Sequence, residues 1–290
     1  MKPTVTIGLP VYNAASFVGD ALRSIFAQSL TDWELIAVDD GSSDGGAALL
    51  QRLRDSRVCV LVDGEHRGLG ARLNQIVALA AGKYIARMDA DDLMHPERLE
   101  RQVTFLESNP AVDVAGCGLV SFDAQGRPTG VRRLPTEHQA ITARPLRGIP
   151  LAHATVVGRR EWWKKHPYNE RSRGCEDWEL WFTSLGDSWF ANLPEPYYFY
   201  REAQAYSFSG YARDKAELAR FLWGQRKRYG APAAAAAVLG QWARIGVYAL
   251  AHLAGMDSAL VRKRGLGLTE AERAAFEAAI ERIRGVALPL

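Results

Sequence analysis

The chain has 290 residues, of which 48% are hydrophobic and 24% are charged, and its net charge is +3 at neutral pH. This composition excludes a largely disordered chain, and so small a charge without a nucleic-acid-binding motif argues against DNA or RNA as a partner. Three cysteines lie far apart, at Cys59, Cys117 and Cys175, which fits a reducing compartment and neither a disulfide framework nor a zinc site. Because the first residues lead straight into a predicted strand without a secretion signal, we expect a cytoplasmic protein.

Short apolar runs alternate with stretches of helical periodicity over the first 90 residues. They predict, in order, strand 4–9, helix 17–28, strand 33–38, helix 46–54, strand 58–62, helix 69–81 and strand 84–88. Strands separated by helices in this way are typical of a doubly wound parallel sheet. The sequence therefore predicts an α/β protein with a Rossmann-like sheet.

Polar loops follow three of these strands, at residues 10–13, 39–44 and 89–92. In a doubly wound sheet, ligands bind beyond the carboxyl ends of the strands, where such loops converge. A carboxylate there can accept hydrogen bonds from a nucleobase or ribose, and the ring of Tyr12 can lie against a base. The alternatives are that Asp44 caps the second helix and that Tyr12 is a half-buried packing residue.

The third loop contains three acids within four residues, Asp89, Asp91 and Asp92. Carboxylates this close repel one another and lose hydration at the end of a buried strand, so a divalent cation among them explains the cluster best. Oxygen ligands favour Mg²⁺ or Mn²⁺ over zinc. The alternative is a polar turn before the next helix, with Asp92 near the N-cap and Pro96 in the first turn, which explains one aspartate of the three.

Two common nucleotide-binding patterns are missing from the sequence. No GxGxxG follows the first strand, which disfavours a nicotinamide enzyme, and no P-loop pattern is present. A cation bound by the acid cluster is then the way of neutralising a diphosphate that the sequence indicates. Arg67, Arg72 and Arg87 are possible helpers, although arginines on helices are usually solvated.

The middle of the chain continues with a predicted helix at 97–108 and a predicted strand at 112–122. Residues 123–150 form a turn-rich loop with five arginines, which either edges the active site and contacts phosphates or an anionic acceptor, or is a solvated surface loop. His153 follows in a short predicted strand that leads into a basic turn.

Four ordered segments carry a family resemblance: VTIGLPVYN, ELIAVDDGSSD, LNQIVALAAGKYIARMDADD and CEDWEL. With them, the chain from Val5 to about Ser209 resembles a family 2 glycosyltransferase with the nucleotide-sugar-binding GT-A fold. The resemblance implies that the nucleotide is held by Pro10, Tyr12, Asn13 and Asp40. It also implies that the motif from Asp89 to Asp91 binds the metal ion that bridges to the donor diphosphate. Within this motif, Asp91 is the expected direct ligand.

The resemblance also assigns residues to the acceptor side. Transfer of a sugar with inversion needs one base to take the proton from the acceptor hydroxyl. The match places this role on Asp177, with Glu176 orienting the base or shaping the acceptor pocket; the alternative is an acidic helix start that favours the helix dipole. His153 matches a His-Ala-Thr element and is expected near the acceptor or the metal, the alternative being a structural histidine.

The last part of the resemblance is a predicted aromatic strand at 197–201, similar to the family's Tyr-Arg element. Related sequences often place a histidine shortly after that arginine, whereas this chain has Ala203 and Gln204. The resemblance therefore does not imply a third protein ligand to the metal.

From Tyr211 onward, alanine, arginine and leucine at helical spacing predict two or more helices. Residues 231–256 are apolar but too interrupted by polar side chains for a comfortable membrane span. Basic clusters at 226–228 and 262–264 favour an appendage that binds a membrane surface or a partner, and the alternative is a helical bundle packed on the catalytic domain. Residues 225–229, QRKRY, are similar to the QxxRW motif of processive synthases but lack its tryptophan, so we expect a nonprocessive enzyme.

The sequence thus predicts an inverting glycosyltransferase that uses Mg²⁺ or Mn²⁺ and a nucleotide-diphosphate sugar, expected to be a UDP-sugar. Its acceptor is a saccharide or a lipid-linked molecule in bacterial polysaccharide or glycolipid synthesis, which places the enzyme in the cytoplasm, in peripheral contact with the inner face of the membrane. We expect a GT-A catalytic domain at 1–210, with a nucleotide-binding half at 1–95 and an acceptor-binding half at 96–210, and a helical appendage at 211–290. The alternatives are a nucleotidyltransferase, which would have a glycine-rich first loop, and a noncatalytic sugar-nucleotide-binding protein.

Overall fold

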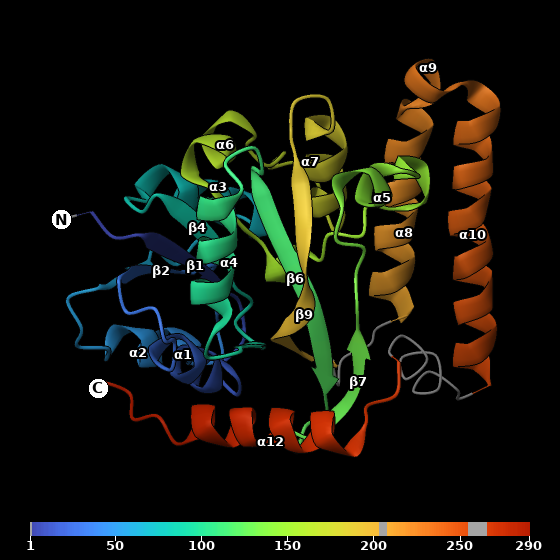
Figure 1. Ribbon diagram of the computed structural model, residues 1–290. Helices are drawn as coiled ribbons and strands as arrows, with labels where there is room; N and C mark the ends of the chain where they lie inside the picture. Colours follow the sequence, from blue (N-terminus) through green and yellow to red (C-terminus); the bar gives the residue numbers. More distant parts are fainter. Residues whose placement is uncertain (1, 203–207, 255–265) are drawn as a thin grey trace.

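The computed structural model describes residues 2–202, 208–254 and 266–290, and within them nine strands form one mixed sheet (Figure 1). The strands are β1 (Val5–Val11), β2 (Trp33–Asp39), β3 (Val58–Val62), β4 (Tyr84–Arg87), β5 (Leu93–Met94), β6 (Val114–Phe122), β7 (Pro128–Arg132), β8 (Val157–Arg159) and β9 (Phe190–Arg201). The α-helices are α1 (Val18–Phe26), α2 (Gly46–Gln51), α3 (Leu69–Leu79), α4 (Arg98–Ser108), α5 (His138–Thr142), α6 (Arg160–Lys165), α7 (Glu176–Ser184), α8 (Phe208–Gly224), α9 (Arg226–Tyr229), α10 (Ala231–Leu253) and α12 (Glu270–Arg284). Short 3₁₀ turns are η1 (Pro145–Arg147) and η2 (His153–Thr155).

The sheet is parallel in its first half and mixed in its second. Its strand order is β3-β2-β1-β4-β8-β6-β9-β5, with β7 paired to β6. The first four strands are parallel, as predicted, whereas β8 runs antiparallel to both β4 and β6, and β9 runs parallel to β6. The predicted α/β class is therefore confirmed, and the doubly wound pattern holds for strands β1 to β4.

Buried strands present apolar side chains to both faces of the sheet. In β2, Leu35 and Ala37 belong to a core with α1 and α4, while Ile36 and Val38 belong to a second core with α3, α6 and α7. Every one of these four side chains is at most 2% exposed. The continuous apolar run follows from this two-sided burial, because a strand covered on both faces has no solvent side.

The turn from α3 into β4 requires Gly82. A Cβ atom at this position would lie 2.5 Å from the backbone nitrogen of Thr6 on β1. The Gly82 N–H donates a hydrogen bond to Thr6 Oγ1 at 2.9 Å. This close approach sets the start of β4 and hence the position of the acids that follow it.

Two local predictions and one alternative interpretation differ from the structure. His153 lies in the 3₁₀ turn η2, not in a strand, and the basic residues after β8 begin helix α6. Leu93 and Met94 form a strand that pairs with β9, and helix α4 begins only at Arg98, so residues 92–96 are not the start of that helix. The segment 123–150 is not simply a loop, since it contains β7, α5 and η1.

The C-terminal helices pack at two separate places. Helices α8 and α10 lie side by side next to α7, where Leu218 and Leu222 are buried with Cys175 (Figure 1). Helix α12 runs along the opposite side, below β7 and α1, and buries Ile280 and Ile283 against the core of β6 and β9. The described residues after 210 contain several helices, as predicted, although residues 266–269 and 285–290 are not helical; the domain boundaries at 95 and 210 stay a prediction.

Helix α10 has the length and apolar composition of a membrane span, although the sequence pattern indicated too polar a segment. Only 11% of its most apolar 18-residue window is buried. Its large exposed apolar side chains are Leu239, Trp242, Val247, Leu250 and Leu253.

Candidate active site

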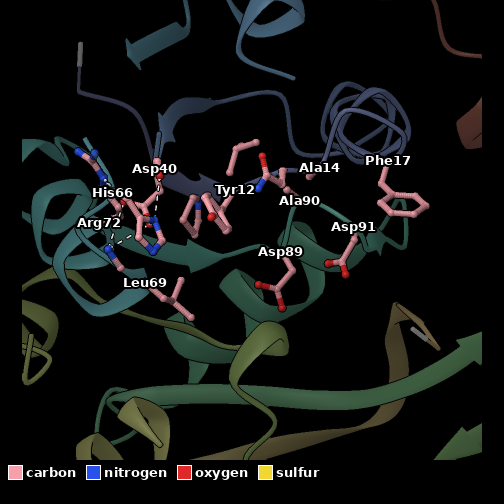
Figure 2. A pocket seen from close by; sticks show the side chains of 14 residues that line it. Tyr12, Ala14, Phe17, Asp40, His66, Leu69, Arg72, Asp89, Ala90 and Asp91 are labelled. Atoms are coloured by element: carbon pink, nitrogen blue, oxygen red, sulfur yellow. Dashed lines mark hydrogen bonds and ion pairs between the residues drawn. The ribbon is translucent and has the colours of Figure 1, made fainter. Parts of the chain in front are cut away.

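The three predicted loops converge on one cavity of about 340 Å³ at the carboxyl ends of β1, β2 and β4. Figure 2 shows Asp40, His66 and Arg72 at one end of this cavity and Asp89 and Asp91 at the other. Seven residues proposed from sequence line it, namely Pro10, Tyr12, Asn13, Asp40, Arg72, Asp89 and Asp91. Three others, His153, Glu176 and Asp177, are not among the residues lining it.

The first loop is tied to the second through Asn13. Its backbone φ of 47° is left-handed, its N–H donates to Ser42 Oγ at 3.0 Å, and its side-chain oxygen accepts from the Ser43 N–H at 2.9 Å. Tyr12 is 52% exposed, so about half of its side chain is free to meet a ligand, and its role as a base-contacting or packing residue stays open. Its ring lies 4.5 Å from that of His66, which sequence reasoning missed. The pair leaves an aromatic surface at the cavity.

Asp40 is buried, and its carboxylate is bound by groups of the protein. It accepts from Arg72 Nε at 2.8 Å, from the backbone N–H groups of Arg67 and Gly68, and it contacts His66 Nδ1 at 2.9 Å. The Arg72 side chain is 0% exposed and also pairs with Asp63, whose pKa it lowers. Asp40 therefore anchors the loop before α3 and forms one wall of the cavity.

The second loop is closed by two other aspartates. Asp39 Oδ2 accepts from the N–H groups of Gly41 and Ser42, while its buried Oδ1 has no partner among the described residues. Asp44 accepts from the Ala15 N–H at 2.7 Å and from the Gly46 N–H at 2.9 Å. Asp44 thus satisfies the start of α2, as its capping interpretation predicts, and it also fixes the first loop.

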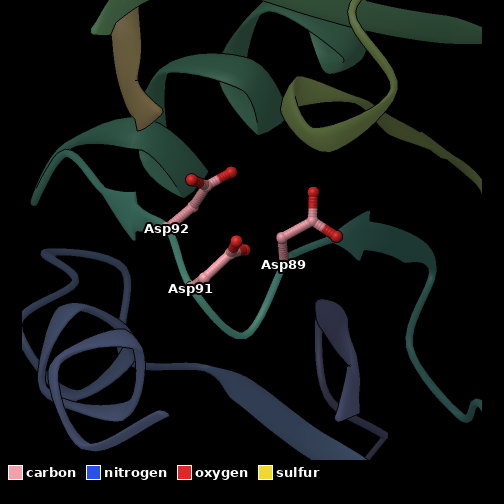
Figure 3. A group of neighbouring side chains, drawn as sticks. All are labelled: Asp89, Asp91 and Asp92. Carbon is pink, nitrogen blue, oxygen red and sulfur yellow. The ribbon is translucent and has the colours of Figure 1, made fainter. Parts of the chain in front are cut away.

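The acids of the third loop gather around one point (Figure 3). One oxygen from each of Asp89, Asp91 and Asp92 lies within 4.8 Å of the others. Burial and the neighbouring carboxylate of Asp89 raise the pKa of Asp91 and, to a greater extent, that of Asp92. The Oδ1 atom of Asp92 accepts from the Arg201 N–H at 2.7 Å, and its buried Oδ2 has no partner in the described chain.

This arrangement fits a hard divalent cation. Three carboxylates that repel one another, one with a buried unpaired oxygen, provide the oxygen donors that Mg²⁺ and Mn²⁺ prefer. Asp89 and Asp91 line the cavity, whereas Asp92 is 1% exposed and joins the loop to β9. Arg201 also donates from Nε to the Asp91 carbonyl at 2.7 Å. Ala203 and Gln204, at the position of the family's histidine, lie outside the described residues.

Arg87 lies between the acid cluster and α7. Its side chain is 6% exposed and forms an ion pair with Asp89. Its charge also opposes the rise in pKa of Glu176 and Asp177. The expectation that these arginines are solvated was therefore wrong for Arg87 and Arg72. The sequence could have indicated the burial of Arg87, because this residue lies inside a predicted strand, where an unpaired charge is costly.

Glu176 and Asp177 begin helix α7, where sequence reasoning placed them. Burial raises the pKa of both carboxyl groups, and it makes them stronger bases than exposed acids. Asp177 Oδ1 accepts from the Trp178 N–H at 2.8 Å. The charge of Lys215 on α8 lowers the pKa of Asp177, so a helix from beyond residue 210 borders this carboxylate.

His153 is held as a neutral imidazole. Its Nε2 atom is 2.7 Å from the Tyr168 hydroxyl, and its ring centre is 5.9 Å from that of Trp181. Burial lowers the pKa of His153 well below its usual value, and Arg87 adds to this effect. Burial raises the pKa of the Tyr168 phenol well above its usual value; the charge of Arg87 opposes this rise and that of Asp177 adds to it.

Comparison with known proteins agrees with this geometry. The model of glycosyl transferase family 2 matches residues 6–172. The putative glycosyltransferase EpsE of Bacillus subtilis is 34% identical over 208 residues, which cover 69% of this chain and 73% of that protein.

Solved structures show the same fold. TarS 1–349 from S. aureus, in complex with UDP, has a TM-score of 0.59 at 19% identity over 77% of this chain and 66% of its own. The mannosyltransferase PcManGT from Pyrobaculum calidifontis, in complex with GDP-Man and Mn²⁺, has a TM-score of 0.60 at 17% identity over 98% of this chain and 86% of its own. The family model matches more than half of the chain, and the structure has a GT-A sheet with these loops. This protein is therefore a glycosyltransferase that belongs to family 2.

Proposed function

We propose that this enzyme is an inverting, metal-dependent glycosyltransferase with a nucleotide-diphosphate sugar as donor. The observation that carries the proposal is the cavity itself, because it joins residues from three separate loops to an acid cluster at one end. A UDP-sugar is the proposed donor. TarS was solved with UDP, whereas PcManGT was solved with GDP-Man, so the base is the first thing to test.

The nucleotide is proposed to lie between the first two loops. Tyr12 offers its exposed ring to the base, Pro10 and Asn13 supply the adjoining wall, and Asp40 closes the far end. Because Arg72 and two backbone N–H groups already bind Asp40, its carboxylate is fixed before any nucleotide arrives. Such preorganisation reduces the ordering cost of binding.

Asp91 and Asp89 are proposed to hold Mg²⁺ or Mn²⁺, which supplies charge stabilisation to a departing diphosphate worth several kcal/mol. Asp91 forms no ion pair among the described residues, so its carboxylate is available to the metal, and we propose it as the main direct ligand. Asp89 shares its carboxylate with Arg87, so this arginine orients it at the edge of the cavity.

Asp177 is proposed as the base and Glu176 as the residue that orients it or shapes the acceptor pocket. The raised pKa of Asp177 makes its carboxylate a better proton acceptor, provided the pH lies above that pKa. His153 is proposed to contribute Nδ1 to the donor or acceptor, since Nε2 is engaged with Tyr168. A neutral imidazole there adds no charge to the acid cluster.

We also propose a cytoplasmic enzyme that contacts the anionic inner face of the membrane through α10, in bacterial polysaccharide or glycolipid synthesis with a saccharide or lipid-linked acceptor. Support comes from the exposed apolar face of α10, the basic residues of α9, and the lack of any Asp or Glu in residues 226–253. Apolar side chains beside basic ones are typical of helices that lie on anionic bilayers. The division into 1–210 and 211–290 belongs to this proposal.

A thermal-shift series tests the donor site. UDP, GDP and their sugars are added to the protein with and without Mn²⁺, and a ligand at 100 times its Kd should stabilise the fold by about 2.7 kcal/mol. Asp91→Asn should lose the Mn²⁺-dependent part of the shift, whereas Asp187→Asn, in an exposed ion pair, should keep it. No shift with any nucleotide would refute the donor site, and no hydrolysis of any donor sugar would favour the noncatalytic alternative.

A further inference from the structure

A second cavity, of about 560 Å³, lies between η1 and α10. Arg144 and Arg147 line it from the η1 side and Arg244 lines it from α10. The helix contributes mainly alanines and Gly240 to the rest of the wall, which leaves room for a ligand next to the guanidinium groups. This arginine groove shares no lining residue with the donor cavity.

The arginine groove carries uncompensated positive charge. All three arginines are exposed, and none forms an ion pair with a carboxylate in the described part of the chain. Within the described residues, these guanidinium groups make one polar contact, that of Arg244 Nη1 with Gln241 Oε1 at 3.5 Å. Among the residues that the structure describes, no Asp or Glu lines the groove or the adjoining cavity that shares Arg144 and Arg147. Three like charges around one space are stabilised by an anion.

The number and type of these side chains indicate the class of anion. Guanidinium groups form planar pairs of hydrogen bonds that match phosphate oxygens, and they do so more readily than lysine ammonium groups. A single carboxylate would neutralise one arginine of the three. A phosphate monoester or a diphosphate carries the two or more charges that the groove can compensate.

The arginine groove lies near Trp178 at the start of α7, the helix that also carries the proposed base. A Cβ atom on Gly148, directly after η1, would lie 3.2 Å from the ring of Trp178, the residue that follows Asp177. Leu146 of η1 packs in the same apolar cluster as Trp178. An anion in the groove would therefore lie near the start of α7, where the proposed base is, and outside the described lining of the donor cavity.

We propose that the arginine groove binds a phosphate or diphosphate group that the acceptor carries. This inference rests on the proposed function, because it names the chemical class of acceptor for the same reaction. The phosphate can belong to a soluble sugar phosphate or to a lipid carrier. Both share the chemistry that the groove recognises, and the exposed apolar face of α10 lies on the same helix as Arg244.

Arginine labelling tests the groove without any need for turnover. The full-length protein is treated with phenylglyoxal, and the labelling rates of Arg144, Arg147 and Arg244 are read by mass spectrometry, with exposed Arg171 as an internal control. The probes are inorganic pyrophosphate, phosphatidylcholine vesicles, and the same vesicles with phosphatidic acid. Protection of the three arginines by pyrophosphate supports a site for soluble phosphates, and protection by phosphatidic acid alone supports a lipid headgroup site. Protection by no probe, or equal protection by both kinds of vesicle, would overturn the proposal.

A variant separates this site from the donor site. With Arg147→Gln, half-protection of Arg144 and Arg244 should need about tenfold more of the protecting probe, because one charge-assisted pair of hydrogen bonds is lost. Arg171→Gln should leave the concentration unchanged. Donor binding by thermal shift should stay the same in both variants. An unchanged protection curve in Arg147→Gln would refute the groove, whereas a missing donor shift in the unmodified protein would refute the donor proposal and leave the labelling result standing.

Discussion

Two buried arginines hold two of the aspartates at the donor cavity in position. Arg72 holds Asp40 and Arg87 holds Asp89, and each guanidinium is at most 6% exposed. A buried arginine without a partner would be costly, so each carboxylate is bound to its cation as part of the fold. The aspartates of the two motifs are therefore positioned by residues outside both motifs.

At the level of single residues, the base assignment makes the first prediction. Asp177→Asn should lower turnover about 10²- to 10⁴-fold, because the amide cannot take the acceptor proton. Donor binding should be unchanged, since Asp177 does not line the donor cavity. Steady-state transfer or donor hydrolysis measures the loss, and Glu179→Gln on the same helix is the matched control. Near-normal turnover in Asp177→Asn would exclude this base.

The charge of Arg87 makes the second prediction, through pH. Arg87 lowers the pKa of Asp177 against the rise caused by burial, so removal of the charge should raise that pKa further. Asp177 acts as a base when it is deprotonated, and activity is lost as the pH falls through its pKa. The acid limb of kcat/KM should therefore move to higher pH in Arg87→Met. Arg87→Lys keeps the charge and should restore most of the profile, while an unmoved limb in Arg87→Met would contradict the electrostatic link.

At the level of elements, the acid cluster is held where two distant segments meet. Leu93 and Met94 pair with Phe199 and Tyr198 of β9, and the Arg201 N–H binds Asp92. A strand of two residues has no independent stability, so this pairing exists only in the folded sheet. It holds residues 93–94 in the sheet, so the alternative interpretation of Asp92 near the N-cap of the next helix does not apply.

The α3–β4 turn makes the third prediction. Gly82→Ala should destabilise the fold by roughly 1–3 kcal/mol, because the new methyl group would meet the backbone of β1 and force it to shift. Gly186→Ala, where a Cβ atom would have no neighbour within 4 Å, is the control and should change stability by less than about 0.5 kcal/mol. Urea unfolding of both variants measures the difference. Equal midpoints would mean that β4 does not approach β1 this closely.

At the level of the whole molecule, the C-terminal segment packs against the N-terminal part of the chain. Helix α12 lies against β6, β9 and α1, and near the C-terminus the Arg54 N–H donates to the Pro289 carbonyl at 2.6 Å. Helix α8, by contrast, borders the proposed base on another side of the molecule. The residues after 210 thus contribute to both the core and the surroundings of the active site.

The fourth prediction concerns α12. Ile283→Ala should cost about 2–5 kcal/mol, as expected for a buried side chain truncated in a core, and unfolding should stay a single transition. Leu250→Ala, on the exposed face of α10, should cost less than about 0.5 kcal/mol. Denaturant unfolding followed by tryptophan fluorescence measures both. A separate early transition in Ile283→Ala would mean that α12 belongs to an independently unfolding appendage.

The sequence by itself determined the order of strands and helices in the first half, the three loops at the strand ends, and the types of residue from which a diphosphate site and a cation site are proposed. Helical and strand periodicity, like the residue types of a motif, depends on residues close together in the chain. Both can therefore be recognised without knowledge of distant contacts. The tertiary structure decided the rest: that Arg72 and Arg87 are buried, that His153 is neutral beside Tyr168, and that three arginines share one groove with α10. Those properties depend on groups far apart in the chain, because burial and pairing arise only when the sheet and the C-terminal helices have packed together.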